Sequence, residues 1–318
     1  MRYFLVLLLS FLLIACSASP ATALRVGYNN WPGYELIWLA DRLGYFKDAG
    51  VSVEHVQFVS LADAKRAYER GQIDAVGVTA VELLQIASND QTPSAQVAMV
   101  LDMSHGADQV LADPSIRQLS DIKGKRFAVE ADSVSVQLAA LLVQKAGLTF
   151  QDVRWVVMPP AQMVDAMKSG AIDLAAIYAP YSIAIQSQSA ARVLFSSADV
   201  PNAIVDMLAV HPEVRARNPK AWQAFFEGVA KALDYYHAHP QQSAQIMAQH
   251  AGMSIDDMNQ TLAGLQIPMR AQQHQLLSSG SDVSNGILAV QQLLPQLGLP
   301  ITVLNEKQLI HAAWPVQP

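Results

Sequence analysis

Apolar residues in the N-terminal part of this chain follow two alternating patterns, short β-like runs and longer stretches with helical spacing. The β-like runs predict strands near residues 24–28, 53–58, 74–78 and 97–101, and again near 126–129, 153–157, 173–177 and 192–195. Between them, helical spacing predicts helices such as 62–70, 81–87, 136–146 and 161–168. Strands that alternate with helices of this length are typical of parallel βαβ units with right-handed crossovers, so we expect an α/β protein.

The chain also repeats itself. Gly71-Gln72-Ile73-Asp74 matches Gly170-Ala171-Ile172-Asp173 at an offset of 99 (173 minus 74). Two further matches keep the same order and nearly the same register, 49–51 with 146–148 and 111–117 with 209–215. A period of about a hundred residues is too long for a solenoid repeat. It predicts two lobes of similar build.

An aromatic loop follows the first predicted strand. Trp31-Pro32-Gly33-Tyr34 cannot continue that strand, because proline removes a ladder donor and glycine marks a turn. Helical spacing begins at Glu35, so Trp31 and Tyr34 lie where a strand passes into a helix, the position at which open α/β sheets hold ligands. We expect the two rings to form an exposed lip of a binding site; the alternative is that they cap the core.

Beyond residue 210 the pattern becomes helical. Asn218-Pro219 is typical of a helix start, and an apolar stripe at helical spacing follows from Trp222 to Leu233. Ser254 to Asp257 resembles a capping box. The aromatic residues of this tail are interpreted as core, and residues 261–284 carry no clear pattern.

Composition limits the possible partners. The chain has 318 residues, 52% of them apolar, a single cysteine and a net charge of −6. It can form a large core, it has no disulfide, and it lacks the basic clusters of nucleic-acid binding or electrostatic membrane docking. We expect a monomer of two lobes that binds no nucleic acid.

The N-terminus predicts export. Residues 1–15 combine a positive charge at Arg2 with an apolar run too short to span a membrane, which is typical of a signal peptide. The lone cysteine, Cys16, ends a segment that resembles the lipobox of bacterial lipoproteins, and residues 16–23 would be a lipidated tether. We expect a protein that faces the periplasm on a lipid anchor, and Ser17 favours the outer membrane leaflet. The alternative is cleavage near Ala21 or Ala23 with loss of Cys16.

The sequence contains none of the common enzyme motifs. G-x-S-x-G, Walker A, G-x-G-x-x-G and H-E-x-x-H are absent, and His237 and His239 are spaced so that they cannot share a helix face. The cysteine-rich motif that is associated with fungal pyrimidine-synthesis enzymes is also absent, since the chain has a single cysteine. We therefore expect neither an enzyme nor a cofactor or metal.

Several segments together resemble one family. They are Trp31-Pro32-Gly33-Tyr34-Glu35 with Trp38-Leu39-Ala40, Gly44-Tyr45-Phe46-Lys47, the G-x-I-D turns at Gly71 and Gly170, Asp121-Ile122-Lys123-Gly124-Lys125, and Ala179-Pro180-Tyr181. With these residues the chain resembles bacterial periplasmic solute-binding proteins that serve importers of nitrate, sulfonates, taurine and thiamine pyrimidine precursors. Many relatives carry a glutamate between an aromatic residue and a proline where this chain has Tyr178-Ala179-Pro180.

The resemblance implies a two-lobed periplasmic-binding-protein fold of type II, with a hinge of two crossing strands near Met103 and 199–202. Lobe 1 would comprise residues 24–102 and 203–318, with the helical tail packed on it, and lobe 2 residues 103–202. The lobes would close on a solute that is then passed to an ABC permease and its ATPase. A sensor that reports the solute to a membrane signalling protein uses the same closure and is an alternative.

The expected cleft is formed by loops at the carboxyl ends of strands, and these loops contain several carboxylates and no lysine or arginine. The candidate ligand-binding residues are Asn30, Trp31, Tyr34, Ser60, Thr79, Glu82, Ser104, His105, Asp108, Glu130, Ser133, Ser135, Tyr178 and Tyr181. This composition favours a neutral or cationic, flat, nitrogen-containing solute, such as a pyrimidine precursor. The alternative is a sulfonate, taurine or nitrate bound by backbone N–H groups near Ser133–Val136.

Overall fold

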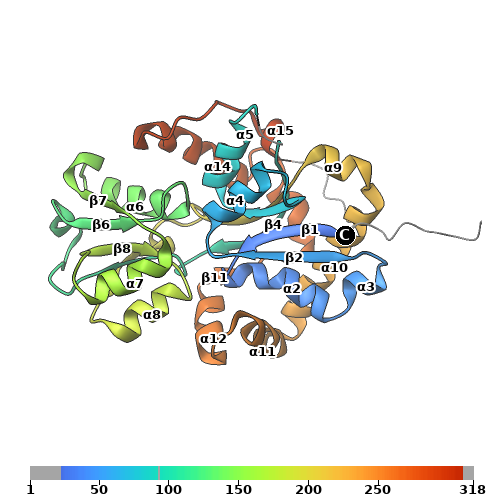
Figure 1. Ribbon diagram of the computed structural model, residues 1–318, viewed down its shortest axis with the longest axis horizontal. Coiled ribbons are helices and arrows are strands. Elements are labelled where there is room, and N and C mark those ends of the chain that lie inside the picture. The colour runs from blue at the N-terminus through green and yellow to red at the C-terminus, as the bar shows by residue number, and fades with distance from the viewer. Residues whose placement is uncertain (1–22, 92–93, 311–318) are drawn as a thin grey trace, which may run out of the picture.

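The computed structural model describes residues 23–91 and 94–310 and divides its strands between two sheets, one in each lobe (Figure 1). Helices lie on both faces of each sheet (Figure 1). The predicted signal peptide, the lipidated Cys16 and the tether up to residue 22 lie outside the described residues. None of the helices in the described part of the chain is long and apolar enough to cross a membrane.

The first sheet has six strands in the order β11-β4-β10-β3-β1-β2. They are β1 (Leu24–Asn29), β2 (Val53–Phe58), β3 (Ala75–Val78), β4 (Gln96–Ser104), β10 (Val205–Val210) and β11 (Leu265–Gln266). The second sheet has five strands in the order β7-β6-β8-β5-β9. They are β5 (Gln109–Ala112), β6 (Arg126–Val129), β7 (Arg154–Val157), β8 (Leu174–Ile177) and β9 (Arg192–Ser196).

The chain crosses between the lobes twice. β4 of the first sheet continues into β5 of the second, and β9 leads through η5 (Ser197–Asp199) back to β10 of the first. β10 pairs antiparallel with β3 and β4, and β5 pairs antiparallel with β8 and β9. Each sheet therefore contains one antiparallel strand that directly follows a crossing, β5 in the second sheet and β10 in the first. The parallel βαβ units expected from the sequence do not include these two strands or the short strand β11, which also runs antiparallel to its neighbour. None of the three was predicted from the sequence pattern.

Helices connect the strands as the spacing predicted. The first lobe contains η2 (Pro32–Tyr34), α2 (Glu35–Arg42), α3 (Tyr45–Asp48), α4 (Leu61–Glu69) and α5 (Ala80–Ala87). The second contains η3 (Leu119–Ile122), α6 (Val134–Lys145), η4 (Phe150–Asp152), α7 (Pro160–Lys168) and α8 (Tyr181–Gln188). The tail contains α9 (Pro212–Arg217), α10 (Pro219–Ala238), α11 (Pro240–Ala251), α12 (Ile255–Ala263), η6 (Arg270–Gln272), α13 (Gln273–Leu276), α14 (Asp282–Leu293), η7 (Leu294–Leu297) and α15 (Glu306–Leu309).

The repeated G-x-I-D turn has the same structural role in both lobes. Its glycine, Gly71 or Gly170, has a φ of 68° and ends a helix, which favours glycine because other residues are strained in this region. Its aspartate clamps the first strand of each repeated unit, β1 or β6. Asp74 accepts hydrogen bonds from the backbone N–H and guanidinium of Arg25 at 2.7–3.1 Å, and Asp173 binds Arg126 in the same way at 2.7–2.9 Å.

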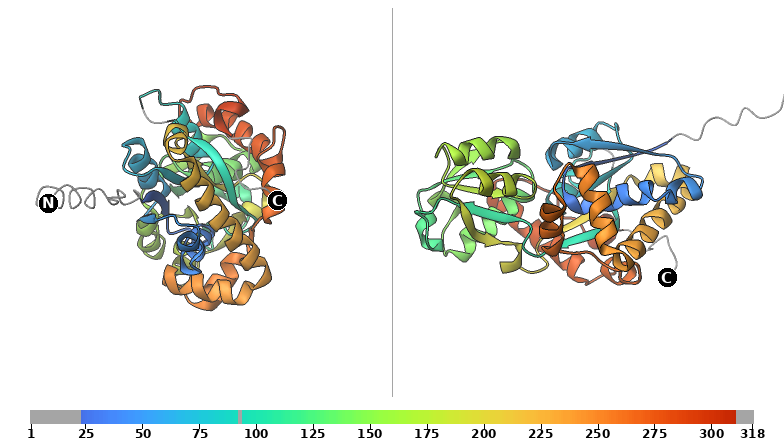
Figure 2. Two further views of the ribbon diagram at one scale, coloured as in Figure 1. Left: turned by 90° about the vertical axis from the view of Figure 1, so that its right-hand side faces the viewer. Right: turned by 90° about the horizontal axis from the view of Figure 1, so that it is seen from below.

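The helical tail packs on the first lobe, as expected. α10 and α11 contact α2, α14 contacts α5, and Figure 2 shows these helices gathered around the sheet of β1. The ring of Phe225 in α10 stacks on Phe46 with centroids 5.1 Å apart. Asn218 caps α10 by accepting a hydrogen bond from the N–H of Ala221, which explains why the helix begins where the sequence predicted.

Candidate functional site

The two lobes meet at the carboxyl ends of their central strands. Asn29, at the end of β1, donates a side-chain hydrogen bond to the Tyr178 hydroxyl after β8 at 3.1 Å. Asn30 donates to the Tyr181 hydroxyl at 3.1 Å, and that hydroxyl donates to the Val59 carbonyl at 3.4 Å. These contacts bring residues of both lobes together, as the position of the loops predicted.

The aromatic residues are buried in this interface. Trp31 is 3% exposed, Tyr34 is fully buried, and the expectation of an exposed lip is wrong for both. The Trp31 ring meets Tyr178 edge to face at 5.8 Å, so it bridges the lobes. Tyr34 instead lies under the interface against Gly77, where a Cβ would come within 2.7 Å of its ring. Its hydroxyl donates to Asp206 at 2.8 Å.

Five buried carboxylates lie at this interface, and we call them the acidic cluster: Glu82, Asp102, Asp108, Glu130 and Asp206. Asp102 and Asp206 face each other on the neighbouring strands β4 and β10. Asp102 accepts a hydrogen bond from Trp31 Nε1 at 3.2 Å. Asp108 stands at the crossing between the lobes, where its N–H donates to Ser104 Oγ at 3.1 Å.

A cavity of about 10 Å³ lies beside the acidic cluster. It is lined by Asn29, Trp31, Leu61, Asp108, Val134, Tyr178 and Asp206, which come from both lobes and both crossings. Space of this size holds about one water molecule. A solute of several heavy atoms therefore requires the lobes to move apart.

The carboxyl groups of the cluster hold protons more tightly than usual. Burial raises the pKa of Asp108 to about 7, and the nearby Glu82 charge raises it as well. Burial raises the pKa of Glu130 to about 7. Asp102 and Asp206 have raised pKa values because both are fully desolvated and each repels the charge of another carboxylate. The cluster therefore favours either protons or a positively charged partner.

Four buried oxygen atoms at the interface have no hydrogen-bond partner within the described part of the chain. They are Asp102 Oδ1, Asp108 Oδ2, Glu130 Oε2 and Asn30 Oδ1. All four are acceptors when the carboxyl groups are ionised, and an unpartnered buried acceptor is costly. The interface is therefore complementary to a group that donates hydrogen bonds.

The helix start proposed for an anion is already occupied. The N–H of Val134 donates to Glu82 Oε1 at 3.2 Å, that of Ser135 to Ser133 Oγ at 3.2 Å, and that of Val136 to the Ser133 carbonyl at 3.0 Å. Ser135 Oγ donates to the Ala176 carbonyl at 2.8 Å. Ser133 and Ser135 thus bind their own lobe in this conformation.

Other candidate residues also have structural partners. Ser60 caps α4, and Thr79 caps α5 together with Glu82. Ser104 Oγ lies 2.8 Å from Ser197 Oγ and joins the two crossings. His105 is exposed and lines a separate hollow with Met103 and Asn202, outside the cavity beside the acidic cluster, so a role in solute binding stays a prediction.

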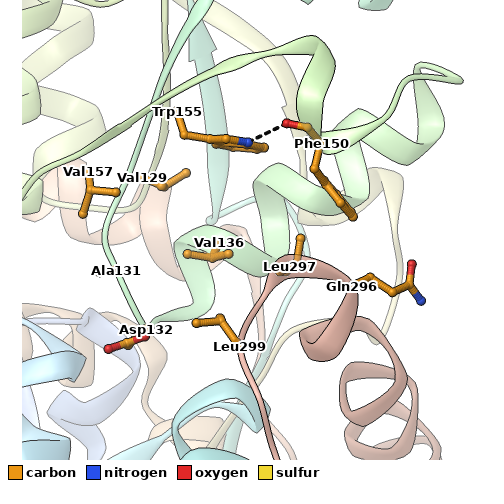
Figure 3. A pocket seen from close by; sticks show the side chains of 10 residues that line it. All are labelled: Val129, Ala131, Asp132, Val136, Phe150, Trp155, Val157, Gln296, Leu297 and Leu299. Carbon is orange, nitrogen blue, oxygen red and sulfur yellow. Dashed lines mark hydrogen bonds between the residues drawn. The ribbon is translucent and has the colours of Figure 1, made fainter.

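Another hollow lies at the outer edge of the interface (Figure 3). It is mainly apolar, and its lining includes Phe150 and Trp155 of lobe 2 and Leu297 and Leu299 of the tail. Trp155 Nε1 donates to the Phe150 carbonyl at 2.7 Å, so the one indole donor is satisfied (Figure 3). The acidic cluster does not reach this hollow.

Asp206 was not predicted from the sequence, and neither Asp102, Asn29 nor Lys65 was among the candidate residues. Asp206 interrupts the apolar strand β10, and extending the 98-residue offset upstream aligns it with Asp108 (206 minus 108). That alignment is the signal that could have found it. Lys65 lies in α4, 3.9 Å from Asp132 of lobe 2. Among the described residues, no group of three or more His, Cys, Asp or Glu is arranged to hold a metal ion.

Comparisons with known proteins agree with this architecture. The family described as NMT1/THI5 like matches residues 31–243. A putative binding protein of Brucella abortus is 26% identical over 247 residues, 74% of this chain and 73% of that protein. A putative aliphatic sulfonates-binding protein of Escherichia coli is 25% identical over 255 residues, 76% of this chain and 75% of that protein. The alkanesulfonate-binding protein SsuA of Xanthomonas axonopodis pv. citri, solved with MOPS, has a TM-score of 0.74 at 21% identity and covers 92% of this chain and 99% of its own.

These matches extend from the aromatic loop into the tail helices, and the structural likeness extends over both lobes. The two-lobed periplasmic-binding-protein fold expected from the sequence is confirmed. The relatives named here are binding proteins. The chain therefore belongs to the NMT1/THI5-like family, and it is a solute-binding component of the kind that serves ABC importers.

Proposed function

We propose that this protein captures a neutral or cationic nitrogen-containing solute, such as a pyrimidine precursor, between its lobes. The observation that carries this choice is the set of unpartnered acceptors, Asp102 Oδ1, Asp108 Oδ2, Glu130 Oε2 and Asn30 Oδ1. A solute with several N–H groups satisfies such acceptors, and a positive charge on the solute balances the carboxylates. The aromatic pair of Trp31 and Tyr178 adds ring surfaces that attract a flat cation.

The solute enters by separation of the lobes. We assign residues 24–102 and 203–318 to lobe 1 and residues 103–202 to lobe 2, and we expect the described parts of the two lobes to move as two bodies. The hydrogen bonds of Asn29 to Tyr178 and of Asn30 to Tyr181 join the two bodies, so they break on opening and re-form on closure. The closed form is then presented to the permease and ATPase of an importer. A membrane signalling partner would use the same closure, and a neighbouring gene for such a partner would favour sensing over import.

The N-terminus would hold the protein at the membrane. Cys16 is the acylated residue of this proposal, and residues 17–23 are the tether. The expected result of Cys16→Ala is release of the protein from the membrane fraction into the soluble periplasmic fraction. Unchanged partitioning of the variant would contradict the lipid anchor.

An anionic solute is the second candidate, because two of the relatives are named as binders of sulfonates. A sulfonate needs unoccupied donors and positive potential. Buried carboxylates at Asp102, Asp108 and Asp206 oppose it, and Lys65 is held by Gln85 at 2.5 Å, outside the cavity lining. We therefore rank the nitrogen-containing solute first.

A thermal-shift screen tests the proposal. The purified protein is titrated with aminopyrimidines and small organic amines in one series, and with methanesulfonate, taurine and nitrate in the other. A solute present at 100 times its Kd adds roughly 2.7 kcal/mol to the free energy of unfolding. We expect shifts in the first series, and stabilisation by the anions alone would overturn the proposal.

Two matched variants locate the binding. Asp108→Asn removes a carboxylate of the cluster, and we expect it to weaken binding of a cationic solute at least tenfold. Asp113→Asn is the control. Asp113 follows the other end of β5 (Gln109–Ala112), and its Oδ1 accepts a hydrogen bond from the N–H of Ser115. We expect this control to bind as the unaltered protein does. Equal effects of the two substitutions would argue against a site at the cluster.

A further inference from the structure

Glu82 reaches from lobe 1 to the start of a lobe 2 helix. It lies in the first turn of α5, and its Oε2 accepts hydrogen bonds from the Thr79 N–H at 2.9 Å and the Thr79 hydroxyl at 2.6 Å. Its Oε1 accepts from the N–H of Val134, the first residue of α6, at 3.2 Å. Three donors directed at one carboxylate favour its ionised form, although full burial raises its pKa.

Glu130 reaches in the opposite direction, from lobe 2 towards a helix of lobe 1. It follows β6 in lobe 2 and is buried. Burial raises its pKa to about 7, and the nearby Ser60 hydroxyl and Ala62 N–H of lobe 1 oppose this rise. Ser60 is the N-cap of α4 in lobe 1, and Ala62 belongs to its first turn. A carboxylate of each lobe therefore lies near the amino end of a helix of the other lobe, and that of Glu82 accepts a hydrogen bond there. These ends carry the partial positive charge and free N–H groups that attract anions.

We infer that Glu82 and Glu130 set the charge specificity of the cleft, because each carboxylate lies at a helix end whose donors an oxyanion solute would need. This inference rests on the proposed capture of a solute between the lobes and explains how a fold shared with sulfonate binders excludes anions. The two glutamates act as internal substitutes for an anionic solute. A nitrogen-containing cation competes for none of these donors.

The covalent attachment of the two glutamates to the chain strengthens the exclusion of anions. A carboxylate held on the same chain competes at an effective concentration that a free anion in the millimolar range does not exceed. Displacing Glu82 also leaves a negative charge near Asp108, whose pKa already rises through the Glu82 charge. An entering anion therefore meets occupied donors and additional repulsion. Removing the glutamate removes both obstacles.

Methanesulfonate is the probe for this inference, followed by isothermal titration and by tryptophan fluorescence. Glu82→Ala vacates the donors of α6, and Glu130→Ala vacates those of α4. We expect each variant to bind methanesulfonate at least tenfold more tightly than the unaltered protein. Glu82→Gln keeps an acceptor oxygen on the Val134 N–H, so its gain is expected to be smaller than that of Glu82→Ala. Glu213→Ala, on the exposed helix α9, is the control and is expected to gain nothing.

Glu130→Ala covers the case in which Glu82→Ala fails to fold, because Glu82 also caps its own helix with Thr79 and Glu130 does not. The inference is overturned if folded variants bind methanesulfonate no better than the unaltered protein, or if the unaltered protein already binds it as tightly. Failure of the proposed solute class would look different. In that case the amines would not bind the unaltered protein, whereas Glu82→Ala would still gain affinity for methanesulfonate.

Discussion

The two lobes share a scaffold and differ where they meet. Both sheets place three parallel strands, one antiparallel strand and one further strand in the same order, and the first sheet adds β11 at its edge. Both clamp the first strand of the repeated unit with an arginine and the aspartate of a G-x-I-D turn, Arg25 with Asp74 and Arg126 with Asp173. At the interface, lobe 1 provides the carboxylates of Glu82, Asp102 and Asp206, whereas lobe 2 provides those of Asp108 and Glu130 together with the hydroxyl groups of Tyr178 and Tyr181.

The lobes therefore contain two kinds of residue, those that stabilise each lobe internally and those that face the other lobe. The clamps hold strands together inside a lobe, so they recur in both copies of the unit. The strand ends face the other lobe, where side chains decide what binds between them. One chemical group does recur there. Asp108 and Asp206 stand at equivalent positions at the start of the antiparallel strands β5 and β10, and both line the interlobe cavity.

The largest expected effect is on the free energy of unfolding, and it compares a core residue of lobe 1 with a residue at the edge of lobe 2. Tyr34→Ala removes a fully buried ring and leaves Asp206 without its hydroxyl donor, so we expect a loss of about 3–5 kcal/mol in the free energy of unfolding. Tyr181 is half-buried and bonds across the interface, so Tyr181→Ala is expected to cost about 1 kcal/mol. Urea unfolding measures both, and equal losses would remove the distinction.

The second prediction concerns pH. Because the folded-state pKa values of Asp108 and Glu130 are raised to about 7, their full contribution to stability is present below the unfolded pKa near 4 and is lost as pH rises through 7. Each group is expected to lower the free energy of unfolding by about 1.4 kcal/mol per pH unit within that window. Asp102, Asp206 and Glu82 face the same space and act in the same direction.

Urea unfolding at pH 5, 6 and 7 measures this slope. Asp108→Asn is expected to reduce it. Asp152 of lobe 2 is the matched control, because hydrogen bonds from Thr149 hold its pKa at about 2, below the measured range. Asp152→Asn is therefore expected to leave the slope unchanged. A slope unaffected by Asp108→Asn would contradict a proton on that carboxyl group.

The smallest effect tests the shared scaffold. Asp74→Asn and Asp173→Asn each weaken one clamp, and we expect both to lower the free energy of unfolding by a similar amount, about 1–2 kcal/mol, because the arginines are partly exposed. Glu213→Gln breaks the exposed pair with Arg217 and is expected to cost less than about 0.5 kcal/mol. A large loss in one lobe only would show that the repeated motif does not have one role.

Local patterns predicted most elements because they depend on neighbouring residues. The strand expected near 126–129 is β6 (Arg126–Val129), and the helix expected at 161–168 is α7 (Pro160–Lys168). β5 and β10 were not placed, although the repeat had matched 111–117 with 209–215. β10 pairs with β3 and β4, which precede both crossings, and β5 pairs with β8 and β9, which lie far along the chain in the same lobe. No local spacing records such pairings.

By itself, the sequence determined the duplicated α/β units, the helical tail and the family, since periodicity, turn residues and short motifs are properties of adjacent positions. Only the tertiary structure decided that Tyr34 is core, that His105 lines a separate hollow, and that Asp206 joins Asp102 and Asp108. It also decided that Glu82 reaches the amino end of α6 in the other lobe. The physical reason is that burial and charge at the interface depend on how two distant parts of the chain close on each other.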